Sequence, residues 1–317
     1  MSATAGLAVG EAARERGGGL LVAAAALCWS TGGLIARTVD TDPWTTVFWR
    51  GLACAGFLLV VIAARAGRDT GRVFAAMGWA GLAVAACFAT ASTCFILALR
   101  HTTVANVLII QSLSPFIAGL LGWVWMGERV AGRTWAAMGL ALVGSAIMVS
   151  RYFVASPAAG SLRGDLLALM VALSFATATV LLRRWRRVHM LPAAALAGLL
   201  TALAAFASAE PRATAPADLL LLAFFGAVQL GFGMILFTAG ARRIPVAEAS
   251  LIGVLESVLG PVWVWLVFGE NPGVLSLLGG AIVLLALAAH TAADLRAERG
   301  ARVDQAGSRK RSSTGTW

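Results

Sequence analysis

Apolar residues gather along the chain into long runs, and short segments that hold most of the charged residues separate these runs. Ten runs can be traced, at residues 19–38, 44–64, 74–99, 102–126, 132–150, 164–182, 191–209, 217–240, 244–268 and 273–292. An apolar helix of about 20 residues, rising about 1.5 Å per residue, crosses the hydrocarbon core of a bilayer. A helix also satisfies its own backbone hydrogen bonds in lipid, whereas the sequence lacks the alternating strands of a membrane barrel. The pattern predicts an all-α integral membrane protein with ten transmembrane helices.

The composition agrees with this prediction. Of the 317 residues 59% are hydrophobic and 13% are charged, where a soluble protein carries roughly a quarter charged residues. A soluble globular protein is therefore excluded. The first run is expected to stay as a membrane helix, because residues 1–18 balance two Arg against two Glu and the run is too long for a signal peptide.

The basic residues are distributed unevenly between the segments that join the runs. If the N-terminus is cytoplasmic, 19 of the 25 Lys and Arg residues fall in cytoplasmic segments and five fall in outer ones, with Arg50 inside a run. The positive-inside rule then places both termini in the cytoplasm. The net charge of +10 is explained by this topology and by contact with anionic lipids, so no nucleic-acid partner is expected.

Motifs that would hold a metal or a cofactor are missing from the sequence. The four cysteines (Cys28, Cys54, Cys87 and Cys94) all fall within apolar runs, so no disulfide framework is expected. The three histidines are far apart, and neither a zinc spacing, a P-loop, a dinucleotide glycine pattern nor a G-x-S-x-G motif occurs. We therefore predict no cofactor, no metal and no enzyme site of the soluble type.

An internal repeat relates the two halves of the chain. The segment VANVLIIQSLSPFIAGLLGWVWMGE (104–128) aligns without gaps to VAEASLIGVLESVLGPVWVWLVFGE (246–270), with seven identities and a shared W-x-x-x-G-E ending. Since each half holds five runs, the second half must enter the membrane from the opposite side. Two inverted five-helix repeats are typical of secondary transporters, whose halves rock about a midplane site. The prolines of the two copies, Pro115 and Pro261, are displaced by four residues, so the halves need not bend alike.

Several longer stretches carry a family resemblance. They are AALCWSTGGLIART, DPWTTVFWRGLACA and VANVLIIQSLSPFIAGLLGWVWMGER in the first half, and GDLLALMVALSFATATVLLRR and LFTAGARRIPVAEASLIGVLESVLGPVWVWLVFGE in the second. Together they resemble the EamA-domain group of the drug/metabolite transporter superfamily, over about residues 19–292. The resemblance implies a secondary transporter, usually an exporter of small metabolites or drugs. It also implies a central cavity lined mainly by the first four helices of each half.

The expected organisation follows from the runs and the resemblance. Residues 1–18 form a cytoplasmic N-terminal segment, 19–150 the first five-helix repeat, 151–163 an outer linker, 164–292 the second repeat and 293–317 a basic, disordered cytoplasmic tail.

Two charged residues lie well inside the predicted runs. Glu256 is roughly 18 Å from the start of its run, near the midplane. It is either a protonatable carboxylate that binds a cationic group or couples transport to protons, or a protonated structural residue bonded to a neighbouring helix. Arg50 lies roughly 9 Å deep and either clamps a solute carboxylate or snorkels to the headgroups. An Arg50–Glu256 pair is a third alternative.

Uncharged polar residues within the runs complete the candidate site. The substrate-binding candidates, with the two charged residues, are Trp29, Ser30, Arg50, Ser92, Gln111, Ser112, Ser174, Thr177, Gln229 and Glu256. Serine and threonine also join membrane helices to one another, so each has a structural alternative. Gln111 and Gln229 are stronger candidates, because an amide needs several hydrogen-bond partners. Trp29 either stacks on a flat solute or packs against neighbouring helices. The candidates for structural or gating roles are Pro115, Glu128, Pro261 and Glu270.

The leading hypothesis is therefore a secondary transporter that exports small organic metabolites, such as amino acids, or drugs. The excess of Arg over Lys and the abundance of Ala indicate a GC-rich genome, which is a statement about composition only. The expected location is the plasma (inner) membrane of a bacterium. A membrane-embedded enzyme would need clustered His or Asp or paired Cys, and a sensor or scaffold would need a soluble output domain. The expected partners are a small-molecule solute, protons as a candidate coupling ion, and membrane lipids. The solute, the transport direction and the oligomeric state stay open.

Overall fold

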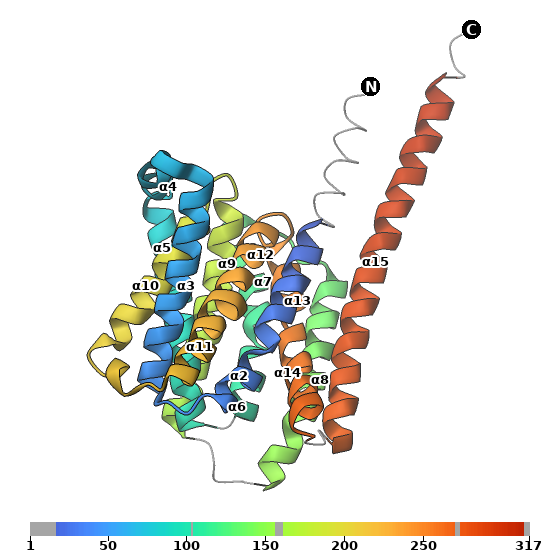
Figure 1. Cartoon of the computed structure of the whole chain (residues 1–317). Coiled ribbons are helices and arrows are strands. Elements are labelled where there is room, and N and C mark those ends of the chain that lie inside the picture. The colour runs from blue at the N-terminus through green and yellow to red at the C-terminus, as the bar shows by residue number, and fades with distance from the viewer. Residues whose placement is uncertain (1–16, 103, 156–160, 270–272, 314–317) are drawn as a thin grey trace.

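The computed structural model of the chain describes residues 17–102, 104–155, 161–269 and 273–313 (Figure 1). All regular structure in these ranges is helical. The first helix belongs to a span at Gly17–Ala36. The helices that follow are α2 (Gly32–Thr38), α3 (Pro43–Ala66), η1 (Gly67–Asp69), α4 (Thr70–Ala76), α5 (Gly78–His101), α6 (Val104–Gln111), α7 (Ser114–Met126), α8 (Gly132–Ala155), α9 (Leu162–Arg184), α10 (Leu191–Phe206), η2 (Pro211–Ala213), α11 (Pro216–Phe224), the π-helix η3 (Phe225–Phe232), α12 (Gly233–Gly240), α13 (Val246–Gly253), α14 (Leu255–Phe268) and α15 (Gly273–Ser313).

Eight spans in the described part of the chain are long and apolar enough to cross a membrane. The two other predicted spans correspond to α8 and α10, which are not among the eight. The helix α10 (Leu191–Phe206) has only 16 residues, and Pro192 lies in its first turn. The all-helical membrane fold is thus confirmed, whereas the count of ten crossings is not.

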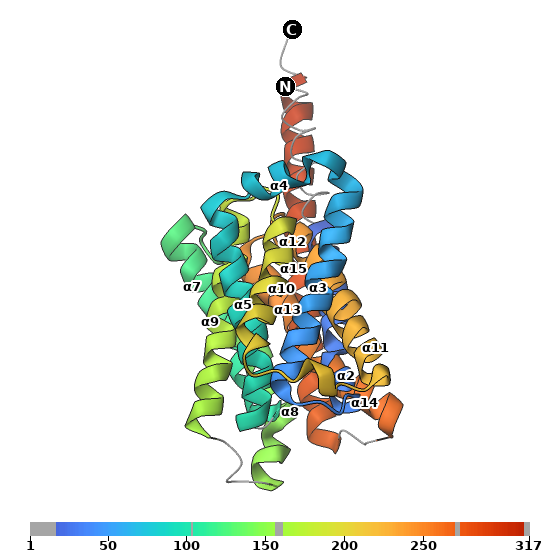
Figure 2. The ribbon, with the colours of Figure 1, turned by 60° about the vertical axis from the view of Figure 1, so that its left-hand side comes forward.

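The last helix is longer than expected. We expected a disordered tail after residue 292, but α15 continues as a helix to Ser313 and extends beyond the rest of the bundle (Figure 2). No proline interrupts this segment, which is rich in the strong helix formers Ala and Arg.

Pairs of glycines bring the two halves into contact. A Cβ atom on Gly51 of α3 would lie 2.8 Å from the carbonyl oxygen of Gly198 in α10, and a Cβ atom on Gly198 would lie 2.8 Å from that of Gly51. Gly144 of α8 and Gly279 of α15 stand in the same reciprocal relation. Small residues let membrane helices approach to backbone distance. Reciprocal contacts of this kind are what a two-fold relation between the halves produces.

The two copies of the repeated segment run in opposite directions. The backbone N–H of Val246, at the start of α13, donates to Glu128 Oε2, just after the end of α7, at 3.4 Å. The end of the first copy therefore lies beside the start of the second. In Figure 1 the chain rises from α6 to α7 and descends from α13 to α14, as an inverted repeat requires.

Several membrane helices are interrupted near their middle. A turn at Thr31 ends the first helix, Ser112 and Leu113 separate α6 from α7, and Val254 separates α13 from α14. Positions 112 and 254 are related by the repeat, as are Gly127 and Gly269, which end α7 and α14 with φ of 67° and 68°. The prolines differ, since Pro115 lies in the first turn of α7 and Pro261 lies inside α14. The halves therefore break at equivalent positions although their prolines do not correspond.

Candidate functional site

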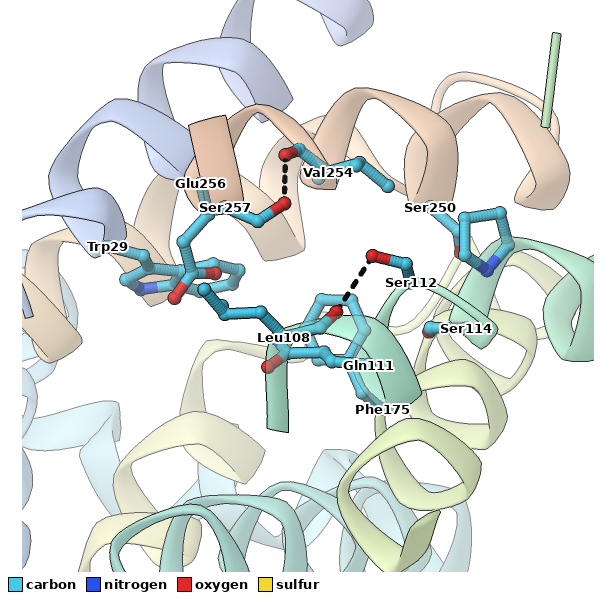
Figure 3. A pocket seen from close by; sticks show the side chains of 12 residues that line it. Trp29, Leu108, Gln111, Ser112, Ser114, Phe175, Ser250, Val254, Glu256 and Ser257 are labelled. Atoms are coloured by element: carbon cyan, nitrogen blue, oxygen red, sulfur yellow. Dashed lines mark hydrogen bonds between the residues drawn. The ribbon is translucent and has the colours of Figure 1, made fainter. Parts of the chain in front are cut away.

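Two adjoining cavities lie where the interrupted helices meet. The first is lined by Trp29, Leu108, Gln111, Ser112, Ser114, Pro115, Phe175, Ser250, Gly253, Val254, Glu256 and Ser257 (Figure 3). The second is lined by Trp29, Gly32, Arg50, Phe88, Ala91, Ser92, Phe95, Gln111, Val171, Phe175, Gln229, Leu230, Met234 and Glu256. About 450 and 560 Å³ of empty space lies within them, part of it open to the outside.

All twelve residues of the first cavity form pairs related by the repeat. Five pairs are 142 positions apart, the offset of the aligned segments: Leu108 and Ser250, Gln111 and Gly253, Ser112 and Val254, Ser114 and Glu256, Pro115 and Ser257. The sixth pair is Trp29 and Phe175. Residues 18–37 align with 164–183 at an offset of 146, which matches Arg37 to Arg183 and Trp29 to Phe175. The first cavity is thus built from the same six positions of both halves.

Arg50 is held in place by neutral partners. It is 6% exposed, its Nη1 donates to Ser92 Oγ at 3.2 Å and its Nη2 donates to Gln229 Oε1 at 3.3 Å. The guanidinium also lies over the ring of Phe225, 4.5 Å from the ring centroid. Its Nε has no partner. In the part of the chain that the structure describes, no ion pair within 4.0 Å joins Arg50 to Glu256.

Gln229 connects Arg50 to the first helix. It lies in the π-helix η3, a rare conformation that is frequent at functional sites. Its Nε2 donates to the carbonyl oxygen of Trp29 at 2.9 Å, while its Oε1 accepts from Arg50. Gly32 leaves room for this contact, because a Cβ atom there would lie 2.8 Å from Gln229 Nε2. The amide therefore sets the position of the guanidinium relative to the first helix.

Glu256 occupies the first turn of α14, directly after the break at Val254. A carboxylate is favoured at the N-terminal end of a helix, where the backbone N–H groups are free. Its side chain lines both cavities, and Figure 3 shows it beside Trp29. Among the described residues the Glu256 carboxyl forms no hydrogen bond and no ion pair. The carboxyl interacts electrostatically with Arg50, but its hydrogen-bonding capacity is available to a ligand.

An aromatic wall adjoins the cavities, and we define it as Trp29, Phe88, Phe175 and Phe237. The first three line at least one cavity, and Phe237 packs behind them. The centroids of Trp29 and Phe175 are 5.8 Å apart in an edge-to-face arrangement, and Phe237 lies 5.1 Å from Trp29 and 5.0 Å from Phe175. Gly233 packs directly against the indole and leaves no room for a Cβ atom. The wall offers a fixed apolar surface next to the polar groups.

Buried polar atoms without a partner gather at these cavities. Five such atoms belong to lining residues: Trp29 Nε1, Arg50 Nε, Gln111 Oε1, Ser114 Oγ and Ser250 Oγ. A buried polar group without a hydrogen-bond partner lowers the free energy of unfolding by about 1–3 kcal/mol, so native proteins contain few such groups. Their concentration here indicates a place that receives a polar ligand or water.

Seven of the ten substrate-binding candidates line these cavities: Trp29, Arg50, Ser92, Gln111, Ser112, Gln229 and Glu256. The other three do not. Ser30 accepts a hydrogen bond from Trp263 Nε1 at 2.8 Å and so joins the first helix to α14. Ser174 is buried in α9, and Thr177 donates to the carbonyl of Leu173 within α9.

The structural and gating candidates lie in different places. Pro115 lines the first cavity, whereas Pro261 lies within α14 outside both lining sets. Glu128 forms an ion pair with Arg183, Nε to Oε1 at 3.0 Å, away from the cavities. Glu270 lies outside the described residues.

Some lining residues were not predicted from the sequence. Ser250, Ser257 and Phe175 were not candidates, although the offset of 142 would have pointed to the first two as partners of lining residues in the first half. No three His, Cys, Asp or Glu side chains of the described residues come together as a metal site requires.

Comparison with known proteins agrees with this arrangement. The sequence profile of the EamA-like transporter family matches residues 16–150 and 162–291. A protein of Archaeoglobus fulgidus, described as an uncharacterized transporter, is 27% identical over 269 residues, which are 85% of this chain and 94% of the relative. A solved structure, described only as the crystal structure of a protein, matches with a TM-score of 0.73 and 18% sequence identity. The match covers 86% of this chain and 96% of the chain in that structure. At that identity the match shows the fold alone. This chain belongs to the EamA-like transporter family, whose profile matches each of its two repeats.

Proposed function

We propose that this protein is a secondary transporter that exports small organic solutes across the bacterial plasma membrane. Its two halves, residues 19–150 and 164–292, would each contribute five crossing helices, with α8 and α10 among them and both termini in the cytoplasm. The observation that carries the proposal is the first cavity, which equivalent positions of two inverted repeats build together. A cavity of this kind can open to either side of the membrane in turn when the halves rock about it.

The interrupted helices support such a movement. Each break separates two half-helices at the cavity, so a half-helix can tilt without moving the whole span.

The ion pair between Glu128 and Arg183 holds α7 and α9 together at one end of the bundle, next to the start of α13. Opening of that end would separate these elements. The close glycine contacts of α3 with α10 and of α8 with α15 would act as pivots.

The solute would bind at the wall shared by the two cavities. Trp29, Gln111 and Glu256 line both, and Arg50, Ser92 and Gln229 line the second. Glu256 would bind a cationic group or a proton, because its carboxyl lines both cavities and interacts electrostatically with Arg50 without forming a hydrogen bond among the described residues. Competition between solute and proton for this carboxylate would couple their movements.

The test compares metabolites in the medium of bacteria that overproduce the wild-type protein, the Glu256→Gln variant, the Ser145→Ala variant or no transporter. Ser145 is a matched control, since its hydroxyl is buried and unpartnered but lies in α8 outside both lining sets. We expect one class of solute to accumulate with the wild type and with Ser145→Ala, and not with Glu256→Gln. If no solute accumulates at equal membrane levels of protein, the export proposal is wrong.

A further inference from the structure

Three arginines lie close together where α9 ends, and we call Arg184, Arg186 and Arg187 the basic turn. All three residues are exposed. The neighbouring Arg183 is already paired with Glu128. No carboxylate of the residues that the structure describes forms an ion pair with the basic turn. The basic turn therefore concentrates positive charge that the described part of the protein does not neutralise.

Hydrogen bonds from two directions hold the basic turn in place. Arg184 Nη1 donates to the carbonyl oxygen of Trp125, in the last turn of α7, at 3.2 Å. Arg242, which follows α12, donates from Nε to the carbonyl oxygen of Arg186 at 2.8 Å. The basic turn therefore lies where the ends of α7, α9 and α12 meet.

One edge of the Arg184 guanidinium stays free in this arrangement. Its Nε and Nη2 form no hydrogen bond with the described residues, since only Nη1 is used. These two nitrogens present parallel N–H groups. A guanidinium edge of this kind binds the two oxygens of a phosphate or a carboxylate with two parallel hydrogen bonds.

An exposed apolar surface adjoins the basic turn. The Arg184 guanidinium lies 5.8 Å from the ring centroid of Trp185, and this ring meets that of Trp79 edge to face at a centroid separation of 4.8 Å. Trp79, in the first turn of α5, is 67% exposed, and Leu82, about one turn further along α5, is 54% exposed. Tryptophan gathers at the level of the lipid headgroups. Cations and indole rings thus lie together at one membrane surface.

We propose that the basic turn and Trp79 form a binding site for an anionic phospholipid. The phosphate pairs with the free edge of Arg184 and with the charge of its neighbours, and an acyl chain lies along Trp79 and Leu82. Arginines at a membrane surface attract anionic headgroups. An anion dissolved in water would use the cations alone and would leave the exposed apolar surface without a partner, which is why the site fits a lipid.

The site is separate from the cavities. None of its residues lines either cavity, so the inference does not depend on which solute the protein carries. Because the basic turn is bonded to α7 and to Arg242, a bound lipid would stabilise the junction of these helix ends.

The first test measures thermal unfolding of the purified full-length protein in neutral detergent micelles. The probes are phosphatidylglycerol, phosphatidylcholine with the same acyl chains, and glycerol phosphate. We expect only phosphatidylglycerol to raise the unfolding temperature, because it alone combines a net negative headgroup with acyl chains. An equal rise with phosphatidylcholine would show that charge is not recognised, and an equal rise with glycerol phosphate would show a site for a free anion. Either result, or no rise with phosphatidylglycerol, contradicts the inference.

Charge variants distinguish this site from the effect of net charge. In titrations followed by the unfolding temperature, Arg184→Gln with Arg187→Gln should weaken phosphatidylglycerol binding about twentyfold, since each arginine near an anionic lipid contributes roughly fivefold. The matched control, Arg65→Gln with Arg68→Gln, removes two exposed cations where α3 ends and should change the affinity less than about threefold. Equal weakening in both double variants would mean that only net charge matters, and the site would be wrong.

A single variant excludes an indirect effect on folding. Arg187→Gln breaks no hydrogen bond of the described structure. It should weaken phosphatidylglycerol binding roughly fivefold and leave the unfolding temperature without lipid unchanged. Binding as tight as that of the wild type would remove Arg187 from the site and contradict the inference.

Trp79→Ala tests the apolar part of the site. The variant should bind phosphatidylglycerol several-fold more weakly, because the acyl chain loses its contact with the exposed indole. Trp265→Ala is the matched control, since Trp265 is a 43% exposed tryptophan in the last turn of α14. The control should bind the lipid as the wild type does. Equal affinities of the two variants would place the lipid elsewhere, and the proposed function would be unaffected.

Discussion

Gln229 accepts a hydrogen bond from Arg50 and donates one to the carbonyl of Trp29, so one amide joins three membrane helices at the cavity. Replacing it with Leu would leave the guanidinium and the carbonyl without these partners. We expect Gln229→Leu to lower the free energy of unfolding by about 1–3 kcal/mol and to reduce transport. Thermal unfolding and solute efflux at equal protein levels measure both effects. Equal stability of Gln229→Leu and the Ser145→Ala control would contradict this role.

Glycine at position 144 is required by the backbone of α15. We expect Gly144→Val to destabilise the protein by about 3 kcal/mol or more, because the added atoms would overlap the carbonyl of Gly279 and the side chain of Val283. Gly139 of the same helix is the matched control, since a Cβ atom there would meet nothing within 4 Å. Unfolding temperatures of Gly144→Val and Gly139→Val should therefore differ by several degrees. If they agree, the α8–α15 contact is looser than described.

The ion pair of Glu128 with Arg183 should contribute to holding one end of the bundle closed. Its side chains are 30% and 13% exposed, so solvent screens it in part. A double-mutant cycle with Glu128→Gln and Arg183→Gln should give a coupling free energy of about 0.5–1 kcal/mol, smaller at high salt. Additive effects of the two substitutions would show that the residues do not interact in solution.

Trp29→Phe would give both halves the same ring, because Phe175 is the repeat equivalent of Trp29. Removal of part of this buried ring leaves a cavity and should cost about 1–3 kcal/mol of stability. The loss of the unpaired indole N–H should weaken binding of the transported solute several-fold, as one neutral hydrogen bond predicts. Thermal unfolding and ligand titration on the same preparation separate the two effects. Unchanged affinity would leave Trp29 as a packing residue only.

The sequence predicted the helical membrane class and the antiparallel pair of copies in α6–α7 and α13–α14, because apolar length and an ungapped repeat are local properties. It did not predict the breaks at Thr31 and Val254. Glycine adjoins both positions, as Gly32 after Thr31 and as Gly253 before Val254. Glycine is frequent in membrane helices, so it does not by itself mark a break.

The partnership of Trp29 with Phe175 was also missed. The two halves correspond at offsets of 142, 146 and 147 in different helices, since their connecting segments differ in length. A single ungapped offset therefore finds only one pair of segments. The seven cavity-lining candidates were found because intramembrane polar groups are few, whereas Ser30 and Thr177 show that such groups also join or brace helices.

The reciprocal lining of the first cavity also bears on how such a site can diversify. The two sides of this cavity are formed by the two copies of the repeat. A substitution in one copy therefore alters the chemistry of one side of the cavity, while the residue of the other copy stays unchanged. Ser114 and Glu256 are such a diverged pair, and Gln111 and Gly253 are another. New solute preferences can then arise from substitutions in one copy alone, without a new fold and without loss of the pairing of positions that shapes the cavity.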